Sequence, residues 1–305
     1  MVILSLTGGS GEGKLFTVQD AVAAVVKTAY DQPATHANSV LYEKRVVTIL
    51  GKSFLQRSND YSASWSEQTE IWHRAGDKKG WMRIAFAPPK FTSAADRKAY
   101  LRLHGSEPAR SREIACRSVL ANSGGSRSPA SALNLPPNTE IPTDPKQAYR
   151  LFKRSVPHGY VGPGGDNEVV WQSIAYAMYG GAPSLKPAQR AAVIGALAEI
   201  PGVSTSGRTS DPLGNSAIGF AHTVGGIRTS LYFDAKTSLV TYFGSVLTTP
   251  RKITGHIRPA GTTIWSQALV DYRYVDDYPR LSQTTLKQAG ILAGLCPEIR
   301  HAGRN

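Results

Sequence analysis

The spacing of apolar residues changes period within residues 187–247, and this change separates a helix from a set of strands. Pro187 is tolerated in the first turn of a helix, where a missing N–H leaves no hydrogen bond unmade. After it, apolar side chains recur every three or four residues up to the break at Pro201-Gly202: Ala191, Ile194, Leu197 and Ala198. This spacing predicts a helix with one buried stripe.

Beyond a polar turn at 211–214 the apolar residues alternate, as they do in strands with one buried face. Breaks at 225–226 and 234–237 divide the stretch that ends at Leu247 into three segments. A helix followed by a three-stranded antiparallel meander is therefore predicted. We expect its core to contain Ile194, Leu197, Ile227, Leu231 and Phe233.

The same reasoning predicts the other elements. A helix from Thr17 to Tyr30 precedes long antiparallel strands at about 39–50, 66–75 and 81–86. Asp144 and Pro145 form a strong start signal for a helix that ends at Pro157. The remaining predicted elements are a helix at about 166–178, a last long strand at about 263–272 and a short helix at about 283–295.

These elements indicate an α+β fold in three parts. Residues 1–16 are expected to form a flexible Gly/Ser linker, and residues 278–305 a basic tail. Between them, residues 17–277 form a single domain. Pro, Ser, Gly and Arg interrupt the pattern at 88–140, where we expect a mobile basic loop with short strands or a short helix near 94–103.

The net charge of +13 suggests contact with anions, and an anionic membrane surface is an open alternative to a solvated basic loop. Nucleic acid is not the expected partner, because the charge is not gathered on a recognition helix or an aromatic platform. No apolar run is long enough to cross a bilayer. Cys116 and Cys296 allow either a disulfide or two free thiols.

Signals for catalysis are weak. Gly8–Lys14 matches most of a phosphate-binding loop, but Leu15 stands where a magnesium-binding hydroxyl belongs. A flexible linker is the preferred interpretation, with a nucleotide-binding enzyme as the weaker alternative. The seven histidines occur singly, outside any zinc-ligand spacing, and no Gly-x-Ser-x-Gly elbow is present. We therefore predict a non-enzymatic protein with no catalytic residue, no metal ligand and no cofactor.

Aromatic residues are the more suggestive feature. Trp72, Trp81 and Trp265 fall on predicted strands beside alternating aliphatic residues. Core packing is one explanation of this pattern. The other is an apolar surface on a curved sheet that takes a lipid tail or a hydrophobic segment of a partner protein. These three residues are the candidate ligand surface.

Several short phrases occur in an order that resembles an uncharacterised family of actinobacterial extracytoplasmic proteins. They span roughly residues 17–277 and are Val40–Glu43, Glu70–Trp72, Ile141–Pro145, Ala196–Val203, Leu231–Asp234 and Gly261–Thr263. The resemblance implies a LolA/RseB-like half-barrel, in which helices cover one side of a curved antiparallel sheet. Family members usually carry a transmembrane helix before this domain. Here we expect the start to lie just after such an anchor, with the domain outside the cytoplasm and associated with the membrane.

The resemblance implies no established activity and no set of functional residues. LolA-like proteins hold the acyl chains of lipoproteins, and RseB-like proteins bind envelope signals and an anti-sigma factor. The leading hypothesis is therefore an envelope protein that binds a lipid or a protein partner on a curved sheet. The alternative is a sensor module linked to an extracytoplasmic sigma factor.

Overall fold

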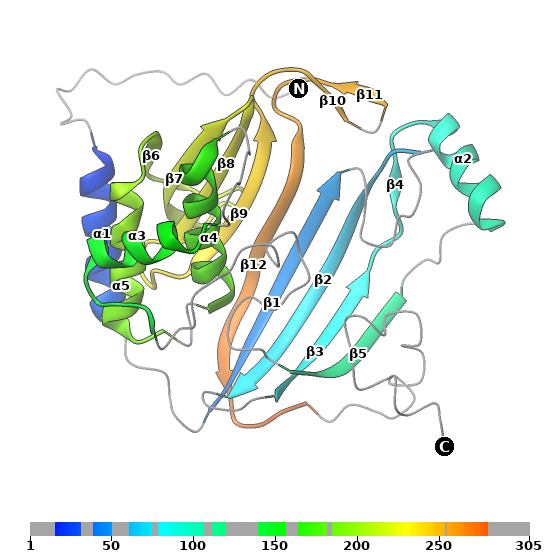
Figure 1. Cartoon of the computed structure of the whole chain (residues 1–305). Helices are drawn as coiled ribbons and strands as arrows, with labels where there is room; N and C mark the ends of the chain where they lie inside the picture. Colours follow the sequence, from blue (N-terminus) through cyan, green and yellow to red (C-terminus); the bar gives the residue numbers. More distant parts are fainter. Residues whose placement is uncertain are drawn as a thin grey trace.

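Two long strands lie side by side at the middle of a single sheet, although they come from opposite ends of the domain. The computed structural model describes residues 16–31, 39–50, 61–74, 79–106, 112–119, 140–156, 164–181, 185–253 and 255–279. Within it, β1 (Val40–Leu50) pairs antiparallel with β12 (Thr263–Val275), with a bulge beside Lys44 and Arg45. This pairing joins the N-terminal strands to the C-terminal ones (Figure 1).

Nine antiparallel strands follow one another across the sheet in the order β5-β3-β2-β1-β12-β9-β8-β7-β6. The strands not yet introduced are β2 (Ala63–Arg74), β3 (Lys79–Phe86), β5 (Arg112–Val119), β6 (Val203–Ser210), β7 (Ser216–Val224), β8 (Ile227–Asp234) and β9 (Val240–Leu247). A two-residue strand, β4 (Lys90–Phe91), pairs with the start of β2, and β10 (Arg251–Ile253) forms a separate hairpin with β11 (His256–Arg258). The predicted α+β class with an antiparallel sheet is confirmed, and the sheet is neither closed nor strongly curled (Figure 1).

Four of the five helices in the described residues gather over the half of the sheet formed by β6 to β9 (Figure 1). They are α1 (Val18–Asp31), α3 (Pro145–Arg154), α4 (Gly165–Gly181) and α5 (Pro187–Gly195), and a 3₁₀ turn at Ala196–Glu199 continues α5. The fifth, α2 (Ala94–His104), lies apart beside β4. None of these helices is long and apolar enough to cross a lipid bilayer.

Local sequence explains where the helices begin. The Gln147 N–H donates to the Asp144 carboxylate at 2.8 Å, with Pro145 in the first turn, as the sequence predicts. At α1, the Asp20 N–H donates to the Thr17 hydroxyl, while the Thr17 N–H donates to the Asp20 carboxylate, which is a capping box with aspartate as the acid. Both caps satisfy N–H groups that have no partner inside the helix.

The core lies between these helices and one face of the sheet. Its largest fully buried side chains are Trp171, Phe152, Phe220, Phe233, Phe243, Ile174, Met178, Ile194, Leu197, Ile218 and Leu231. Four of the five predicted core residues are therefore confirmed. Ile227 is only partly buried, because it begins β8 next to the exposed turn at Gly225.

The sheet contains strands that the alternation of apolar residues does not predict. β6 occupies Val203–Ser210, where Val203 is the only large apolar residue, because an edge strand with alternate residues in solvent can be built from Ser and Thr. β4, α2 and β5 all lie within the segment expected to be a basic loop, and α2 matches the short helix expected near 94–103. Gly8–Lys14, the predicted helix at 283–295 and Cys296 lie outside the described residues.

Strand register assigns each side chain to one of two faces, because paired residues project to the same side of the sheet. We call the side against which the helices pack the helix face. On β1 it carries Leu41, Glu43, Arg45, Val47 and Ile49, and on β2 it carries Trp65, Glu67, Thr69, Ile71 and His73. The opposite side is the far face, which on β1 carries Val40, Tyr42, Lys44, Val46 and Thr48.

Candidate functional site

The three candidate tryptophans do not form one surface. Trp72 pairs directly with Trp81 across β2 and β3, and it also pairs with Tyr42, which places all three on the far face. Trp265 pairs with Ile49 on the helix face, where its ring lies 4.8 Å from that of Phe243. The register therefore does not place Trp72, Trp81 and Trp265 on a single ligand surface.

On the far face the aromatic rings have polar partners. The Tyr42 hydroxyl donates to Glu70 at 2.9 Å, and burial together with this hydrogen bond raises the pKa of Tyr42 to about 12. Arg83 pairs with the same carboxylate and lies over the Trp72 ring, 5.9 Å from its centroid. Because Trp72 is only 9% exposed, these contacts indicate a packed structural cluster.

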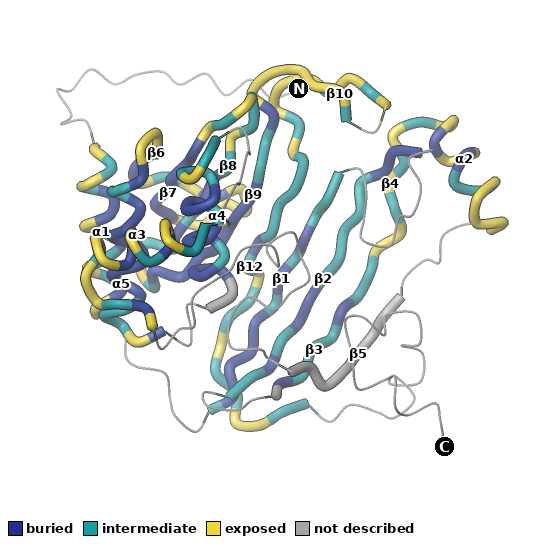
Figure 2. Tube along the Cα trace, in the orientation of Figure 1, coloured by how far each residue is buried: buried dark blue, intermediate teal, exposed yellow. Residues whose placement is uncertain are grey.

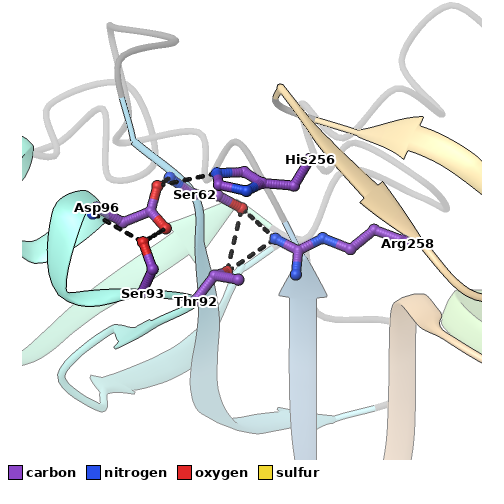
Figure 3. A network of polar contacts seen from close by, with 6 residues as sticks. All are labelled: Ser62, Thr92, Ser93, Asp96, His256 and Arg258. Carbon is purple, nitrogen blue, oxygen red and sulfur yellow. Dashed lines mark hydrogen bonds and ion pairs between the residues drawn. The ribbon is translucent and has the colours of Figure 1, made fainter.

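A second group of polar residues joins three separate parts of the chain at one end of the sheet (Figure 3). Asp96 receives hydrogen bonds from the Ser62 N–H at 2.7 Å and the Ser93 hydroxyl at 2.6 Å, and the His256 Nε2 lies 3.3 Å from it. Arg258 donates from the hairpin to the hydroxyls of Ser62 at 2.7 Å and Thr92 at 2.8 Å. We call these six residues the clasp: Ser62, Thr92, Ser93, Asp96, His256 and Arg258.

The clasp contains serine, histidine and aspartate, but its geometry is not that of a nucleophile and its base. The Ser93 hydroxyl caps α2, and the Ser62 hydroxyl accepts from Arg258. Among the described residues no serine hydroxyl is hydrogen-bonded to the His256 ring, which such a triad requires. Burial alone would raise the pKa of Asp96, yet the hydrogen bonds from Ser93, Ser62 and His256 outweigh it and lower that pKa. The clasp therefore fastens the β10–β11 hairpin to α2 and β2.

A third polar group is buried between α4 and the helix face of β1. Arg45, 8% exposed, forms an ion pair with Glu43 and donates to the Tyr179 carbonyl oxygen at 2.7 Å. Its guanidinium also lies 4.2 Å from the centroid of the Tyr179 ring. Burial would lower the pKa of Arg45, but Glu43 and Tyr179 reverse this and raise it. These contacts give Arg45 a counter-charge, while its Nε is buried without a hydrogen-bond partner.

Arg190 on α5 is the contrasting case in the same region. Its side chain is 4% exposed, and its Nη2 donates one long hydrogen bond of 3.4 Å to the Leu185 carbonyl oxygen. Its Nε has no hydrogen-bond partner, and no carboxylate of the described residues pairs with it. Burial lowers the pKa of Arg190, and the nearby phenols of Tyr272 and Tyr274 offset this in part.

Two further ionisable groups lie on the helix face of β2, away from the main helix bundle. Burial raises the pKa of Glu67 to about 7, and its neighbours in register are Val47 and Phe86. Burial also lowers the pKa of His73, which pairs with Leu41. Both shifts favour the neutral form, so this part of the face is apolar in character although it contains an acid and a base.

None of Glu43, Arg45, Arg190 or the clasp residues was predicted as a site from the sequence. Glu43 and Arg45 differ from an ordinary polar face only by their partners, which come from α4 and β12. Arg190 does carry one signal, because its helical spacing to Ile194 and Leu197 places it in line with the apolar stripe of the predicted helix. Comparison with protein-family models and with curated proteins finds no match for this chain.

Proposed function

We propose that this protein binds a hydrophobic or amphipathic ligand on the helix face of β12, β1, β2 and β3, and that it is not an enzyme. The observation that supports the proposal is that apolar side chains are buried on β1 and β2, although the main contacts of the helices are with other strands. The main contacts of the helices with the sheet are those of α1 with β6 and β7 and of α4 with β7 and β9. Buried positions nevertheless continue along β1 and β2 (Figure 2).

The chemistry of this half of the face suits an apolar ligand. Its apolar side chains are Leu41, Val47, Ile49, Trp65, Ile71, Met82, Ile84, Phe86, Trp265 and Leu269. Leu41, Val47 and Ile84 are 3%, 7% and 6% exposed. Binding sites for small hydrophobic molecules are lined in this way, with a few polar groups that fix orientation. Of the predicted tryptophans, only Trp265 belongs to this surface.

A half-barrel of the LolA/RseB type is the finer form of the proposal, and in it the ligand would be an acyl chain. Support comes from the ordered phrases in the sequence and from helices grouped on one side of an antiparallel sheet. The open sheet argues for a ligand that lies across the strands and not inside a closed barrel. In keeping with this, we propose that the protein acts outside the cytoplasm at a membrane, which fractionation of the native host would test.

The direct test is whether purified protein carries or takes up lipid. Protein expressed in bacteria is extracted with organic solvent for mass spectrometry, and delipidated protein is titrated with a fluorescent fatty acid. We expect saturable binding that Val47→Trp weakens by about tenfold or more, since the larger ring occupies the face between Gln267 and Glu67.

The matched control is Val270→Trp, because Val270 is 50% exposed on the same sheet. This variant should bind the probe like the parent protein. Absence of bound lipid together with absence of probe binding would overturn the proposal. A protein partner captured in place of lipid would favour the sensor alternative.

A further inference from the structure

We propose that Arg190 binds the anionic headgroup, a carboxylate or a phosphate, of the amphipathic ligand. The inference rests on the binding function proposed above and names the chemical class of the ligand. The site consists of Arg190 on α5 and of Tyr272 and Tyr274 on β12. Both tyrosines interact electrostatically with Arg190, which brings α5 of the helix bundle together with β12.

The first step of the argument is the missing partner. Arg45 and Arg190 are both buried arginines, 8% and 4% exposed. Arg45 has a carboxylate, a carbonyl oxygen and an aromatic ring around it. Arg190 has one long hydrogen bond to a carbonyl oxygen, and the Nε of each arginine is buried without a hydrogen-bond partner. Arg190 therefore differs from Arg45 in having no carboxylate partner among the described residues.

The second step is energetic. A guanidinium keeps its proton in proteins, so Arg190 cannot escape burial by becoming neutral. A buried charge without a counter-charge is strongly unfavourable, and natural chains rarely retain one unless it is paired. An anion from outside the chain would supply the missing charge. Carboxylate and phosphate match the planar fork of arginine donors with two parallel hydrogen bonds.

The third step concerns the tyrosines opposite Arg190. Both project from the helix face of β12, where Tyr272 pairs with Glu43 and Tyr274 pairs with Leu41. Burial raises the pKa of Tyr272, whose hydroxyl is also hydrogen-bonded to Tyr274. Tyr272 therefore stays protonated at neutral pH. The hydrogen bond with Tyr274 favours the protonated phenol, so the Tyr272 O–H already has an acceptor and the phenol does not supply the missing negative charge beside Arg190.

The fourth step is the surroundings of the site. Glu43 lies next to Tyr272, but its charge is met by Arg45, so it does not neutralise Arg190. From Tyr272 the helix face continues through Glu43 to Ile71 and Met82, and from Tyr274 it continues to Leu41. A ligand anchored at Arg190 can thus lay its tail along apolar side chains of β1, β2 and β3. A charged head and an apolar tail are the two features of an amphipathic lipid.

The test compares a fluorescent fatty acid with its methyl ester, which has the same tail and no charge. We expect the parent protein to bind the acid about tenfold or more tightly than the ester. Arg190→Met should remove this preference while binding the ester as before. Arg150→Met, on the exposed face of α3, is the matched control and should keep the preference. Arg190→Lys keeps a charge but loses the fork, and we expect it to retain part of the preference.

The outcomes separate this inference from the proposed function. Equal binding of acid and ester by the parent protein would overturn the anion site while leaving lipid binding intact. Binding of neither probe would overturn both. A lysophosphatidic acid that binds more tightly than the fatty acid, with the same dependence on Arg190, supports the site and identifies phosphate as the head. If inorganic phosphate alone binds as tightly as either lipid, the ligand is a free anion and the amphipathic proposal fails.

Discussion

The helix face of the sheet carries different kinds of side chain in its two halves. Over β7, β8 and β9 the helix face presents mainly large apolar side chains to the bundle: Ile218, Phe220, Leu231, Phe233 and Phe243, each at most 2% exposed. His222 is buried among them, with its ring 5.9 Å from that of Trp171. Over β1 and β2 the same face carries Glu43, Arg45, Glu67, Thr69 and His73 among its aliphatic residues. The first half is a largely apolar core, and the second carries a higher share of ionisable groups.

The difference indicates that the two halves of the helix face have separate roles. Burial of apolar surface stabilises a fold without directional requirements, whereas buried charges cost free energy unless each finds a partner. A sheet selected for stability alone would repeat the first pattern across its width. Groups that persist in the second half at an energetic cost are therefore candidates for recognition.

The largest effect is expected from breaking the buried ion pair of Glu43 and Arg45 on β1. Glu43→Gln leaves the Arg45 guanidinium buried without its carboxylate and should lower the free energy of unfolding by about 3–5 kcal/mol. Urea denaturation followed by circular dichroism measures this. Replacing both residues, as Glu43→Leu with Arg45→Met, removes both charges and should recover most of the loss. A loss below about 1 kcal/mol in the single variant would contradict burial of the pair.

In the covered half, Leu231→Ala should cost about 2–5 kcal/mol, because Leu231 is 0% exposed and its removal leaves a cavity among phenylalanines. The matched control is Leu213→Ala in the turn before β7. Leu213 is 50% exposed, so this change should stay within about 0.5 kcal/mol of the parent protein. Equal effects of the two substitutions would show that β8 does not carry the core.

The sequence predicts strands in both halves of the sheet, since β1, β2, β3 and β12 form where strands are expected, and it also predicts core residues in the half over which the helices pack. Its helix and strands have strong periodicity, and Ile194, Leu197, Leu231 and Phe233 are buried as expected. Prediction fails for β6, where Ser and Thr carry the alternation, and for the β10–β11 hairpin, whose strands are three residues each. Short or edge strands depend on pairing with a neighbour, and a neighbour's position is not visible in local sequence.

The site residues are less predictable, for a related reason. Arg190 and Tyr272 are separated by most of the C-terminal half of the chain, and their proximity follows from the fold. Glu43 and Arg45 occupy alternate positions, which in sequence is typical of a solvated strand face. Trp72, Trp81 and Trp265 were grouped by residue type, but strand parity places Trp265 on the opposite face. Assignment to a face needs the register, and the register is set by tertiary structure.

A smaller effect, the pH dependence of stability, should distinguish the two halves of the sheet. The folded-state pKa of Glu67 is raised to about 7 from 4.5, so the folded protein holds its proton more tightly than the unfolded chain does. The stability linked to Glu67 is therefore greatest below pH 4.5 and falls as pH rises to about 7, on the order of 3 kcal/mol in all. Glu67→Gln should flatten this part of the stability profile, measured by urea denaturation at several pH values. Glu140→Gln, at an exposed position, should leave the profile unchanged.

The smallest effect is expected at the clasp, which lies outside both halves. The His256 side chain is 41% exposed, so its contact with Asp96 contributes about 0–1 kcal/mol to global stability. His256→Ala should instead increase amide hydrogen exchange at Ile257 and Arg258 while exchange in β8 stays unchanged.

Asp96→Asn should act more strongly, because it also weakens the cap of α2 and the hydrogen bond from the Ser62 N–H. Since the pKa of Asp96 is lowered, its contribution is present above its unfolded value of 3.8 and is lost as pH falls further. Faster exchange in β8 than in the hairpin would mean that the clasp supports the core and is not a local fastening.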